Sequence, residues 1–213
     1  MVEEKKRKGR RKGEKGKRGQ APIPSRDLVI EFIDRCADHR HPARNQAIMT
    51  VFFSLGLRPK EASKLKLGDV YDFDRDELRD DLFLDKEYTK RAKTRILPMT
   101  GSMLKKYLLP YILERKNAGR RFRPDQALFL SQKGGHFSPN SLGNLMNDFL
   151  EKRFEFRRGS SYSARRFFAT TMYRNEVGLK TIQELMGHAS ISTTQIYTVP
   201  SEEQKQDAVR GVL

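Results

Sequence analysis

Three side chains toward the end of the chain have types and spacings suited to chemistry on a phosphodiester. Arg165 lies in a Ser- and Phe-rich segment, His188 follows a glycine 23 residues later, and Tyr197 comes nine residues after that. An arginine can stabilise phosphate charge, an imidazole can bind or move a proton, and a phenol oxygen can be a nucleophile. These residues can therefore surround one phosphodiester. Tyr197 stands in a polar segment, which we expect to be a loop or frayed helix that lets its hydroxyl swing.

The composition indicates a folded domain with a polyanionic partner. The chain has 213 residues, 37% of them hydrophobic, and a formal net charge of +16. This length suits one large domain, or one domain with an appendage, around a real core. The charge indicates either nucleic acid or an anionic membrane surface as partner. No apolar run reaches membrane-spanning length, and nothing resembles a secretory signal.

Cysteine and histidine usage predicts neither disulfides nor a metal centre. A lone cysteine, Cys36, excludes an internal disulfide and fits a reducing cytosol. It falls on an apolar helical stripe, so we interpret it as a packed core residue. No Cys or His cluster has zinc-ligand spacing. The acidic stretch between residues 72 and 81 is interpreted as a solvated loop, and we predict no metal site and no cofactor.

Residues 1–21 form a basic, low-complexity tail. Ten basic against three acidic side chains give this tail +7 of the net charge of +16. Such a segment has too few apolar side chains to offset the entropy of ordering, so we expect it to be disordered alone. It can lie along DNA phosphates or enter a minor groove, and it can equally be a solubilising or localising tail.

Apolar periodicity predicts a mainly α fold with a small antiparallel β-sheet, an α+β class. Ser25 and Ser138 are predicted helix N-caps, Gly56 a helix end, and Pro110 the site of a kink. Strands are predicted over 81–88 and 94–99. Helices are predicted over 25–36, 43–55, 102–117, from 138 onward and over 163–176.

Arg58 is predicted to lie at a corner between two helices. Pro59 suits the first position of a short helix that carries Glu61. A guanidinium at such a corner can point into a cleft, and Glu61 can hold Arg58 or the surrounding loop by hydrogen bonds. Taken alone, an arginine before a proline is an ordinary surface residue.

The two predicted strands enclose a strongly basic hairpin tip. We predict that this tip contacts the DNA backbone or a groove, and that it can deliver one lysine to a reacting phosphate. The cations at or beside the tip are Lys90, Arg91, Lys93 and Arg95.

Four motifs together resemble a known family. In chain order they are Gly56-Leu-Arg58-Pro-Lys-Glu61, Lys93-Thr-Arg-Ile-Leu-Pro98, Arg165 with Phe168-Ala-Thr170, and Leu185-Met-Gly-His188 with Tyr197. This chain resembles the catalytic domain of the tyrosine recombinases, the phage-integrase superfamily. The resemblance covers residues 22–200. It divides the chain into the tail 1–21, a catalytic domain 22–200 with the tyrosine-recombinase fold, and a C-terminal tail or helix over 201–213.

The resemblance implies a role for each matching residue. Arg58 and Arg165 resemble the two catalytic arginines, and Tyr197 resembles the nucleophile. His188 matches the late histidine, and Lys90 the catalytic lysine, with Lys93 as the alternative. We further expect Glu61 to lie beside the site, and Arg91, Arg95 and Arg166 to contact DNA.

The chain departs from the family pattern at one catalytic position. Tyr162 stands where the family usually has histidine, and Arg166 stands where histidine is common. We expect the Tyr162 hydroxyl to lie beside the Arg165 guanidinium as a phosphate ligand. A phenol with a pKa of about 10 is a poor general base near neutral pH, so His188 or water takes the proton of Tyr197.

By resemblance, the chain is a site-specific DNA recombinase of the integrase or invertase type. Tyr197 then forms a covalent 3′-phosphotyrosyl intermediate on double-stranded DNA without a metal. The protein is expected to be cytoplasmic and nucleoid-associated, and a homo-tetramer on DNA with residues 201–213 docked in trans. The chain resembles the short single-domain DNA inverters or a catalytic fragment of a longer protein. The alternatives are a non-catalytic DNA-binding regulator with this fold and a type IB topoisomerase.

Overall fold

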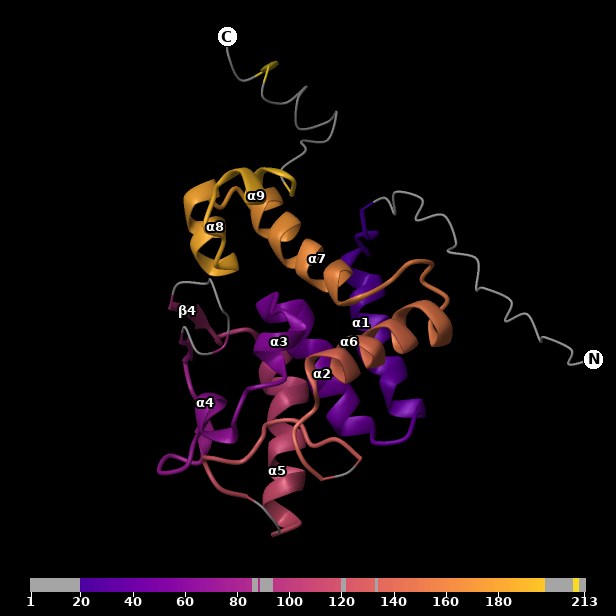
Figure 1. Ribbon diagram of the computed structural model, residues 1–213, viewed down its shortest axis with the longest axis vertical. Helices are drawn as coiled ribbons and strands as arrows, with labels where there is room; N and C mark the ends of the chain where they lie inside the picture. The colour runs from indigo at the N-terminus through magenta and orange to yellow at the C-terminus, as the bar shows by residue number, and fades with distance from the viewer. Residues whose placement is uncertain are drawn as a thin grey trace, which may run out of the picture.

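The protein is mainly helical, with two small antiparallel sheets (Figure 1). The computed structural model describes residues 20–85, 88, 94–119, 122–132, 134–197 and 209–210. In the view of Figure 1, the helices up to α6 form the lower body, and α7 leads from it to α8 and α9 at the top. The predicted fold class, mainly α with a small antiparallel sheet, is confirmed.

Two N-terminal helices build the centre of the core. Helix α1 (Arg26–Arg35) begins after Ser25, whose hydroxyl accepts a hydrogen bond from the Leu28 N–H as predicted. A short turn, η1 (Cys36–Asp38), leads to α2 (Pro42–Leu55). Helix α2 is buried on nearly all sides and packs against α1, α7 and the segment before α5. Cys36 is fully buried in this core, and burial raises the pKa of its thiol to about 12.

Two short helices and a small hairpin follow α2. Helix α3 (Pro59–Ala62) starts at a proline, and α4 (Leu67–Val70) leads into β1 (Tyr71–Asp72), which pairs with β2 (Glu77–Leu78). The acidic stretch that was predicted to be a solvated loop is an exposed turn that joins these two strands, and the backbone folds back through Asp76 with a φ of 60°. Strands of two residues each are too short to show the alternation of apolar and polar residues that marks a strand, so the sequence gives no signal for this hairpin.

The predicted hairpin is present, with shorter strands than expected. Strands β3 (Asp81–Leu84) and β4 (Arg95–Pro98) pair antiparallel, with Leu84 opposite Arg95 and Phe83 opposite Ile96. One face of the strand pair is buried and carries Leu84 and Arg95 together with Leu82 and Leu97. The other face, with Phe83 and Ile96, is exposed. Its hairpin tip, with Lys90, Arg91 and Lys93, lies outside the described residues.

The remaining helices of the body each begin with recognisable chemistry. A π-helical turn, η3 (Leu104–Leu108), precedes α5 (Leu109–Asn117), in which Pro110 occupies the first turn. The helix is continuous over residues 102–117, and its π-helical turn ends just before Pro110, which lacks an N–H to donate within the helix. Helix α6 (Pro139–Asn147) is capped by Ser138 as predicted, and it continues into a second π-helical turn, η4 (Asp148–Arg153).

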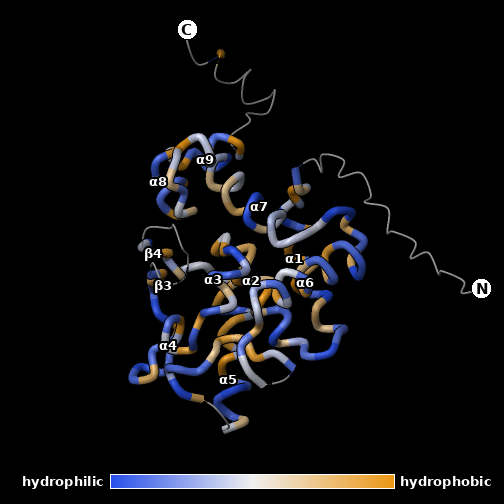
Figure 2. The backbone as a smooth tube through the Cα atoms, viewed as in Figure 1, coloured by the Kyte–Doolittle hydropathy of each residue, from blue (hydrophilic) through white to orange (hydrophobic). Residues whose placement is uncertain are grey.

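The C-terminal helices form a small second core. Helix α7 (Ser161–Arg174) packs against α2 with its first half and against α8 (Leu179–Met186) farther on, and α9 (Ser192–Gln195) packs on α8. Buried Ala169, Ile182, Met186 and Tyr197 gather between them. This cluster is separate from the large core around α2, which Figure 2 shows as apolar segments inside the body.

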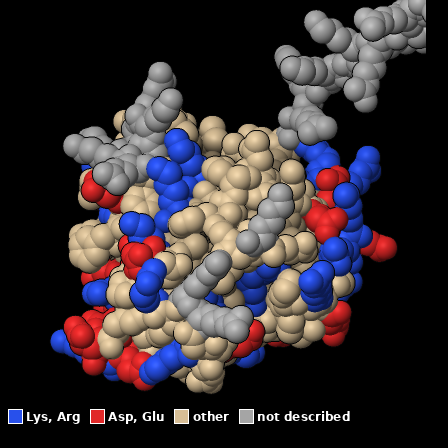
Figure 3. Space-filling view, turned by 60° about the horizontal axis from the view of Figure 1, so that its bottom comes forward, with Lys and Arg blue, Asp and Glu red and all other residues tan. Residues whose placement is uncertain are grey.

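Charge is mixed over the lower face of the protein. Figure 3 shows basic and acidic side chains interspersed there around other residues, without one continuous basic field. In the described part of the chain, no helix has the length and apolar content needed to cross a bilayer. On this face, an anionic partner could therefore be bound only by local groups of cations, and the net charge alone does not indicate where it binds.

Candidate active site

A left-handed glycine places Arg58 at the corner between α2 and α3. Gly56 ends α2 with a φ of 59°, a conformation that side chains with a Cβ rarely adopt. A Cβ at Gly56 would also lie 2.4 Å from the ring of Phe168 on α7. The chain therefore turns sharply and packs closely on α7, and the Arg58 side chain stays about one third exposed, at 35%.

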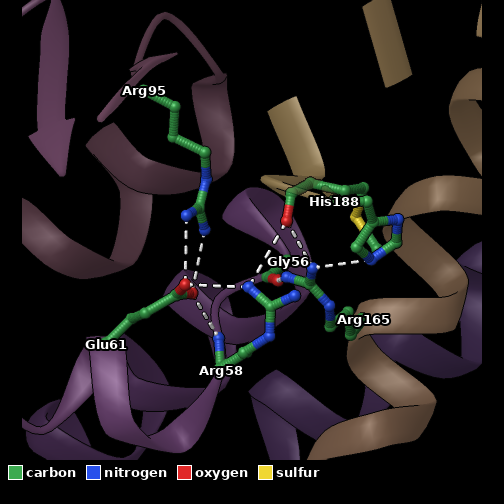
Figure 4. A network of polar contacts seen from close by, with 7 residues as sticks. Gly56, Arg58, Glu61, Arg95, Arg165 and His188 are labelled. Carbon is green, nitrogen blue, oxygen red and sulfur yellow. Dashed lines mark hydrogen bonds and ion pairs between the residues drawn. The ribbon is translucent and has the colours of Figure 1, made fainter. Parts of the chain in front are cut away.

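The Glu61 carboxylate joins two guanidiniums in the interior (Figure 4). It accepts the Arg58 backbone N–H at 2.8 Å and Arg58 Nη1 at 3.0 Å. It also accepts both terminal nitrogens of Arg95, at 3.0 and 2.8 Å, in a two-point pair. Burial alone would raise the pKa of Glu61, but the hydrogen bonds and charge of Arg95, with the Arg58 N–H, bring that pKa below its usual range. Glu61 is therefore ionised and fixes Arg58 from behind.

The prediction that Arg95 is an exposed DNA contact was wrong. Its side chain is 6% exposed and lies against Glu61. Strand alternation places Arg95 on the same buried face as Leu97, whereas Ile96 between them points outward. That parity was the signal in the sequence. The guanidinium also packs on Gly187, whose φ is 61° and where a Cβ would lie 2.7 Å from Arg95 Nη1.

Arg165 and Arg58 converge on one backbone carbonyl. Arg165 donates from Nη1 to the Gly56 carbonyl at 2.6 Å and from Nη2 to the Met186 carbonyl, which Arg58 Nη1 approaches at 3.5 Å. Arg165 is 3% exposed. Burial, with repulsion from Arg58, lowers the pKa of its guanidinium to about 10, so it stays charged at neutral pH. Two guanidiniums that share one acceptor have an arrangement suited to binding an anion.

His188 lies between Arg165 and Tyr197, and it is neutral at pH 7. Its Nε2 is 3.0 Å from Arg165 Nη2, and its Nδ1 is 2.9 Å from the Thr194 hydroxyl. The imidazole stacks on the Tyr197 ring with centroids 5.9 Å apart. Burial and the neighbouring guanidiniums, Arg165 first, lower the pKa of His188 to about 4.

His188 is expected to make the protein less stable as the pH falls from about 6.5 to about 4. In that range the unfolded chain binds a proton at this histidine and the folded chain does not, so unfolding is favoured. Between pH 7 and pH 5 the loss is up to about 2 kcal/mol. Urea unfolding of the unmutated protein and of His188→Gln at both pH values measures it. Equal losses in the two proteins would contradict this assignment.

Tyr197 is packed, and not loose as its polar surroundings suggested. The residue comes two positions after the end of α9, is 9% exposed, and belongs to the small core between α7 and α8. Its carbonyl accepts the Thr170 hydroxyl at 3.4 Å, and its N–H donates to the Thr194 carbonyl at 3.0 Å. The expected loop is present as a turn after the short α9, and the Tyr197 side chain is packed within it. The ring is held beside His188 by aromatic stacking.

One large cleft opens in front of these groups. Its volume is about 1280 Å³, and it is bordered by α3, α6, α7 and the segment after α9. Tyr162 borders it with a 67% exposed side chain. In the described structure the Arg165 hydrogen bonds go to two carbonyls and His188, so the expected fixed place for the Tyr162 hydroxyl is not seen. The residues that line the cleft include Arg58, Arg158, Tyr162, Arg165, Arg166 and Tyr197.

Comparison with known proteins decides the family. The sequence profile described as "Phage integrase family" matches residues 26–204, most of the chain. The chain belongs to the phage integrase family. The resemblance inferred from the four motifs is confirmed. Among curated members, the chain is 34% identical over 172 residues to Tyrosine recombinase XerC of Haemophilus ducreyi, covering 79% of this chain and 51% of the relative.

Other family members give the same picture. Tyrosine recombinase XerD of Mycobacterium tuberculosis strain H37Rv is 32% identical over 192 residues, which cover 84% of this chain and 59% of the relative. The chain thus spans about half to three fifths of the length of these relatives. The crystal structure of XerA recombinase has a TM-score of 0.68 at 22% identity and covers 93% of this chain and 65% of its own. The structure of XerH bound to its difH substrate has a TM-score of 0.67 at 22% identity. This match covers 89% of the present chain and 54% of the XerH chain. These two likenesses show the fold.

Two arginines at the cleft hold the end of the basic tail. Arg158 Nη2 donates to the Gln20 carbonyl at 3.1 Å, and Arg166 Nη1 donates to the Ala21 carbonyl. Gln20 and Ala21 line the same cleft. Gln20, at which the described part of the chain begins, therefore lies beside the candidate active site of this family member. Sequence reasoning missed Arg158, since a lone arginine in a loop carries no distinguishing signal.

The family's lysine position is outside the described residues, as are Lys93 and Arg91. The cations brought together within the described ranges are Arg58, Arg95 and Arg165, with Arg166 at the cleft wall. Sequence reasoning also missed the carbonyls of Gly56 and Met186 and the hydroxyls of Thr170 and Thr194. Backbone acceptors leave no mark in a sequence, and the two threonines lie among other polar residues. No group of three or more His, Cys, Asp and Glu in the described ranges is arranged to hold a metal ion.

Proposed function

We propose that this chain is the catalytic domain of a site-specific DNA recombinase that cleaves and rejoins DNA through a phosphotyrosyl bond. The observation that carries the proposal is the meeting of two guanidiniums, a neutral imidazole and a tyrosine at one cleft. Arg58 and Arg165 share the Met186 carbonyl, and His188 touches both Arg165 and Tyr197. Each group has a distinct task in transfer of a phosphodiester to a phenol oxygen.

The proposed reaction is an in-line displacement at phosphorus. The Tyr197 oxygen forms a bond to the scissile phosphorus, and the bond from phosphorus to the 5′ oxygen breaks. The leaving oxygen takes a proton, and we propose Lys90, or alternatively Lys93, as the donor of that proton. The products are a 3′-phosphotyrosyl link and a free 5′-hydroxyl. A 5′-hydroxyl of another strand reverses the step without an energy source, because the covalent link conserves the bond energy.

Arg58 and Arg165 are proposed to bind the non-bridging oxygens. Both now donate to the Met186 carbonyl, a neutral acceptor, and a charged phosphate oxygen is a stronger acceptor for the same N–H groups. Glu61 holds Arg58 at the backbone and at the side chain, so this donor is oriented before DNA arrives. Preorganised donors of this kind stabilise the charge that develops in the transition state.

His188 is proposed to accept the Tyr197 proton. Its pKa of about 4 keeps the ring unprotonated at pH 7, and its ring lies against that of Tyr197. A phenol is a poor general base near neutral pH, so we assign Tyr162 a hydrogen bond to phosphate. Arg166 and Arg91 are proposed to contact the DNA backbone. The paired Arg95 is a support of Arg58.

Double-stranded DNA is the proposed partner. XerH was captured on its difH substrate, and the Tn1549 transposon integrase in complex with transposon right-end DNA. A homo-tetramer on DNA, with residues 201–213 docked on a neighbouring subunit, remains a proposal, since only Val209 and Arg210 of that segment are described. Measuring the mass of the protein–DNA complex formed by the full chain, and of the complex formed by the chain without residues 201–213, tests this proposal. We expect the truncated chain to lose the tetramer.

Covalent trapping on a DNA library tests the function. Nicked suicide duplexes with randomised inverted-repeat arms are mixed with the protein, and adducts that survive denaturation are sequenced. We expect adducts on a defined site, with protein on the 3′ end and a free 5′-hydroxyl. Tyr197→Phe provides the background. Absence of any adduct favours the non-catalytic regulator, and relaxation of supercoiled DNA without a site requirement favours the topoisomerase.

Deleting residues 1–20 is expected to weaken binding to all duplexes alike. The tail carries clustered positive charge and joins the folded domain at the cleft. Each phosphate contact that is lost lowers the slope of log affinity against log salt by about 0.9. Titrations at several salt concentrations measure the slope, and a tail of shuffled sequence with the same composition should restore it. An unchanged slope after deletion means that the tail does not contact DNA.

A further inference from the structure

Thr194 lies behind His188, on the side away from Arg165. It belongs to α9 and is fully buried, at 0% exposure. Its hydroxyl is 2.9 Å from His188 Nδ1, which is ordinary hydrogen-bond distance. Neighbouring Thr193, on the same short helix, is exposed, and its N–H donates to the Ser190 carbonyl. A buried hydroxyl whose recorded partner is a site imidazole is a specific arrangement.

The partners of the imidazole determine which nitrogen carries the proton. A guanidinium can only donate, so Nε2 of His188, 3.0 Å from Arg165 Nη2, must be the acceptor and must lack a proton. The neutral ring then has its proton on Nδ1. That N–H donates to the hydroxyl oxygen of Thr194. The opposite tautomer would set two donors against each other at Nε2.

We propose that Thr194 is a positioning residue of this active site. Its hydroxyl oxygen accepts the Nδ1 proton of His188 and so keeps the Nε2 lone pair directed toward Arg165. The catalytic consequence rests on the function proposed above. When a phosphate draws the Arg165 donors away, the Nε2 lone pair becomes available for the Tyr197 proton, and Thr194 still holds the ring.

The surroundings of His188 keep the ring neutral and leave the tautomer to its hydrogen bonds. Arg165 faces it from α7, Arg58 from the start of α3, and Arg95 from β4. Glu61 partly offsets these three positive charges. Since the cations disfavour the imidazolium, two neutral tautomers remain. Arg165 favours the one with an unprotonated Nε2, and Thr194 supplies the acceptor that the Nδ1 proton of this tautomer needs. A hydroxyl is suited to this, because it offers a buried acceptor oxygen to the buried Nδ1–H group.

The tautomer can be observed directly by nitrogen NMR of the full chain labelled on histidine. Of four histidines, His188 is assigned by its loss in His188→Gln. We expect a protonated Nδ1 and an unprotonated Nε2 in the unmutated protein, in Thr194→Ser, which keeps the hydroxyl, and in the matched control Thr193→Val. Thr194→Val should shift the population toward protonated Nε2. A protonated Nε2 in the unmutated protein, or an unchanged ring in Thr194→Val, overturns the proposal.

Cleavage of the suicide duplex gives the second readout. Thr194→Val should slow cleavage by about tenfold or more, because it leaves a buried N–H without an acceptor. Thr194→Ser and Thr193→Val should stay within about threefold of the unmutated rate. Thr194→Ala removes the same acceptor with less bulk and replaces Thr194→Val if that variant unfolds early. Equal slowing by the valine and serine variants indicates packing alone and overturns the proposal.

The two experiments fail independently. If the unmutated protein forms no adduct on any duplex, the proposed recombinase function fails, and the NMR experiment still decides the tautomer. If adducts form but the tautomer and the rates do not respond to Thr194, the recombinase function stands and the role of Thr194 falls.

Discussion

Replacing Tyr197 with phenylalanine is expected to abolish the covalent protein–DNA adduct and to leave binding to the DNA site intact. The change removes the one oxygen that attacks phosphorus, so cleavage should fall by more than about 10⁴-fold. The ring itself packs in the small core with Met186 and stacks on His188, and phenylalanine keeps both contacts. The Arg58 and Arg165 donors are untouched, so affinity for the phosphate remains.

The measurement is denaturing-gel detection of adduct on a nicked duplex, followed by peptide mapping of the modified residue. Tyr162→Phe is the control, because Tyr162 borders the same cleft. This variant should cleave more slowly and still give an adduct on Tyr197. Tyr173, partly buried beside the small core, should never be modified. An adduct mapped to Tyr162, or one that persists in Tyr197→Phe, would overturn the assignment of the nucleophile.

Local chemistry made most of the fold predictable. The helix over 43–55 was visible because its apolar residues recur at helical spacing and Gly56 ends it, and the structure has α2 at Pro42–Leu55. Ser25 and Ser138 cap helices as predicted, because a serine hydroxyl satisfies a first-turn N–H. The family motifs placed Arg58, Arg165, His188 and Tyr197 correctly around one site, since each is fixed by a short local element.

Contacts between distant segments were not predictable in the same way. The Glu61–Arg95 pair joins residues 34 positions apart, and neither position alone shows that both will be buried. Likewise, the polar stretch before Tyr197 suggested exposure, whereas α9 buries one of its threonines against His188. A polar side chain is buried when a partner satisfies it, and the partner is defined only once the fold is formed.

The Glu61–Arg95 pair supports the second large prediction, which concerns stability. Arg95→Met is expected to lower the free energy of unfolding by about 3–5 kcal/mol. Both side chains are nearly inaccessible, at 0% and 6% exposure, so removal of the arginine leaves a buried carboxylate that Arg58 alone must satisfy. Methionine fills much of the same volume without charge, so most of the loss reports the uncompensated carboxylate.

A double-mutant cycle separates this charge effect from packing. Glu61→Gln alone leaves the Arg95 cation buried and should also be strongly destabilising. The double variant Glu61→Gln, Arg95→Met has neither charge, so its loss should be smaller than the sum of the two single losses. Urea unfolding at pH 7 gives all three values, and Arg75→Met, whose pair with Glu77 is 72% and 60% exposed, is the surface control. That control should change stability by less than about 0.5 kcal/mol.

The same variants separate support of the fold from support of the site. Glu61 holds Arg58 at 2.8 and 3.0 Å, so a weaker carboxylate partner should loosen the guanidinium that is proposed to bind phosphate. Glu61→Gln should therefore slow cleavage by about tenfold or more even under conditions in which the variant is fully folded. Arg95→Met leaves both contacts between Glu61 and Arg58 in place and should slow cleavage less than Glu61→Gln does. Single losses that add without coupling would contradict the Glu61–Arg95 pair as the source of the stability. A cleavage rate that follows stability alone would show that Glu61 does not orient Arg58.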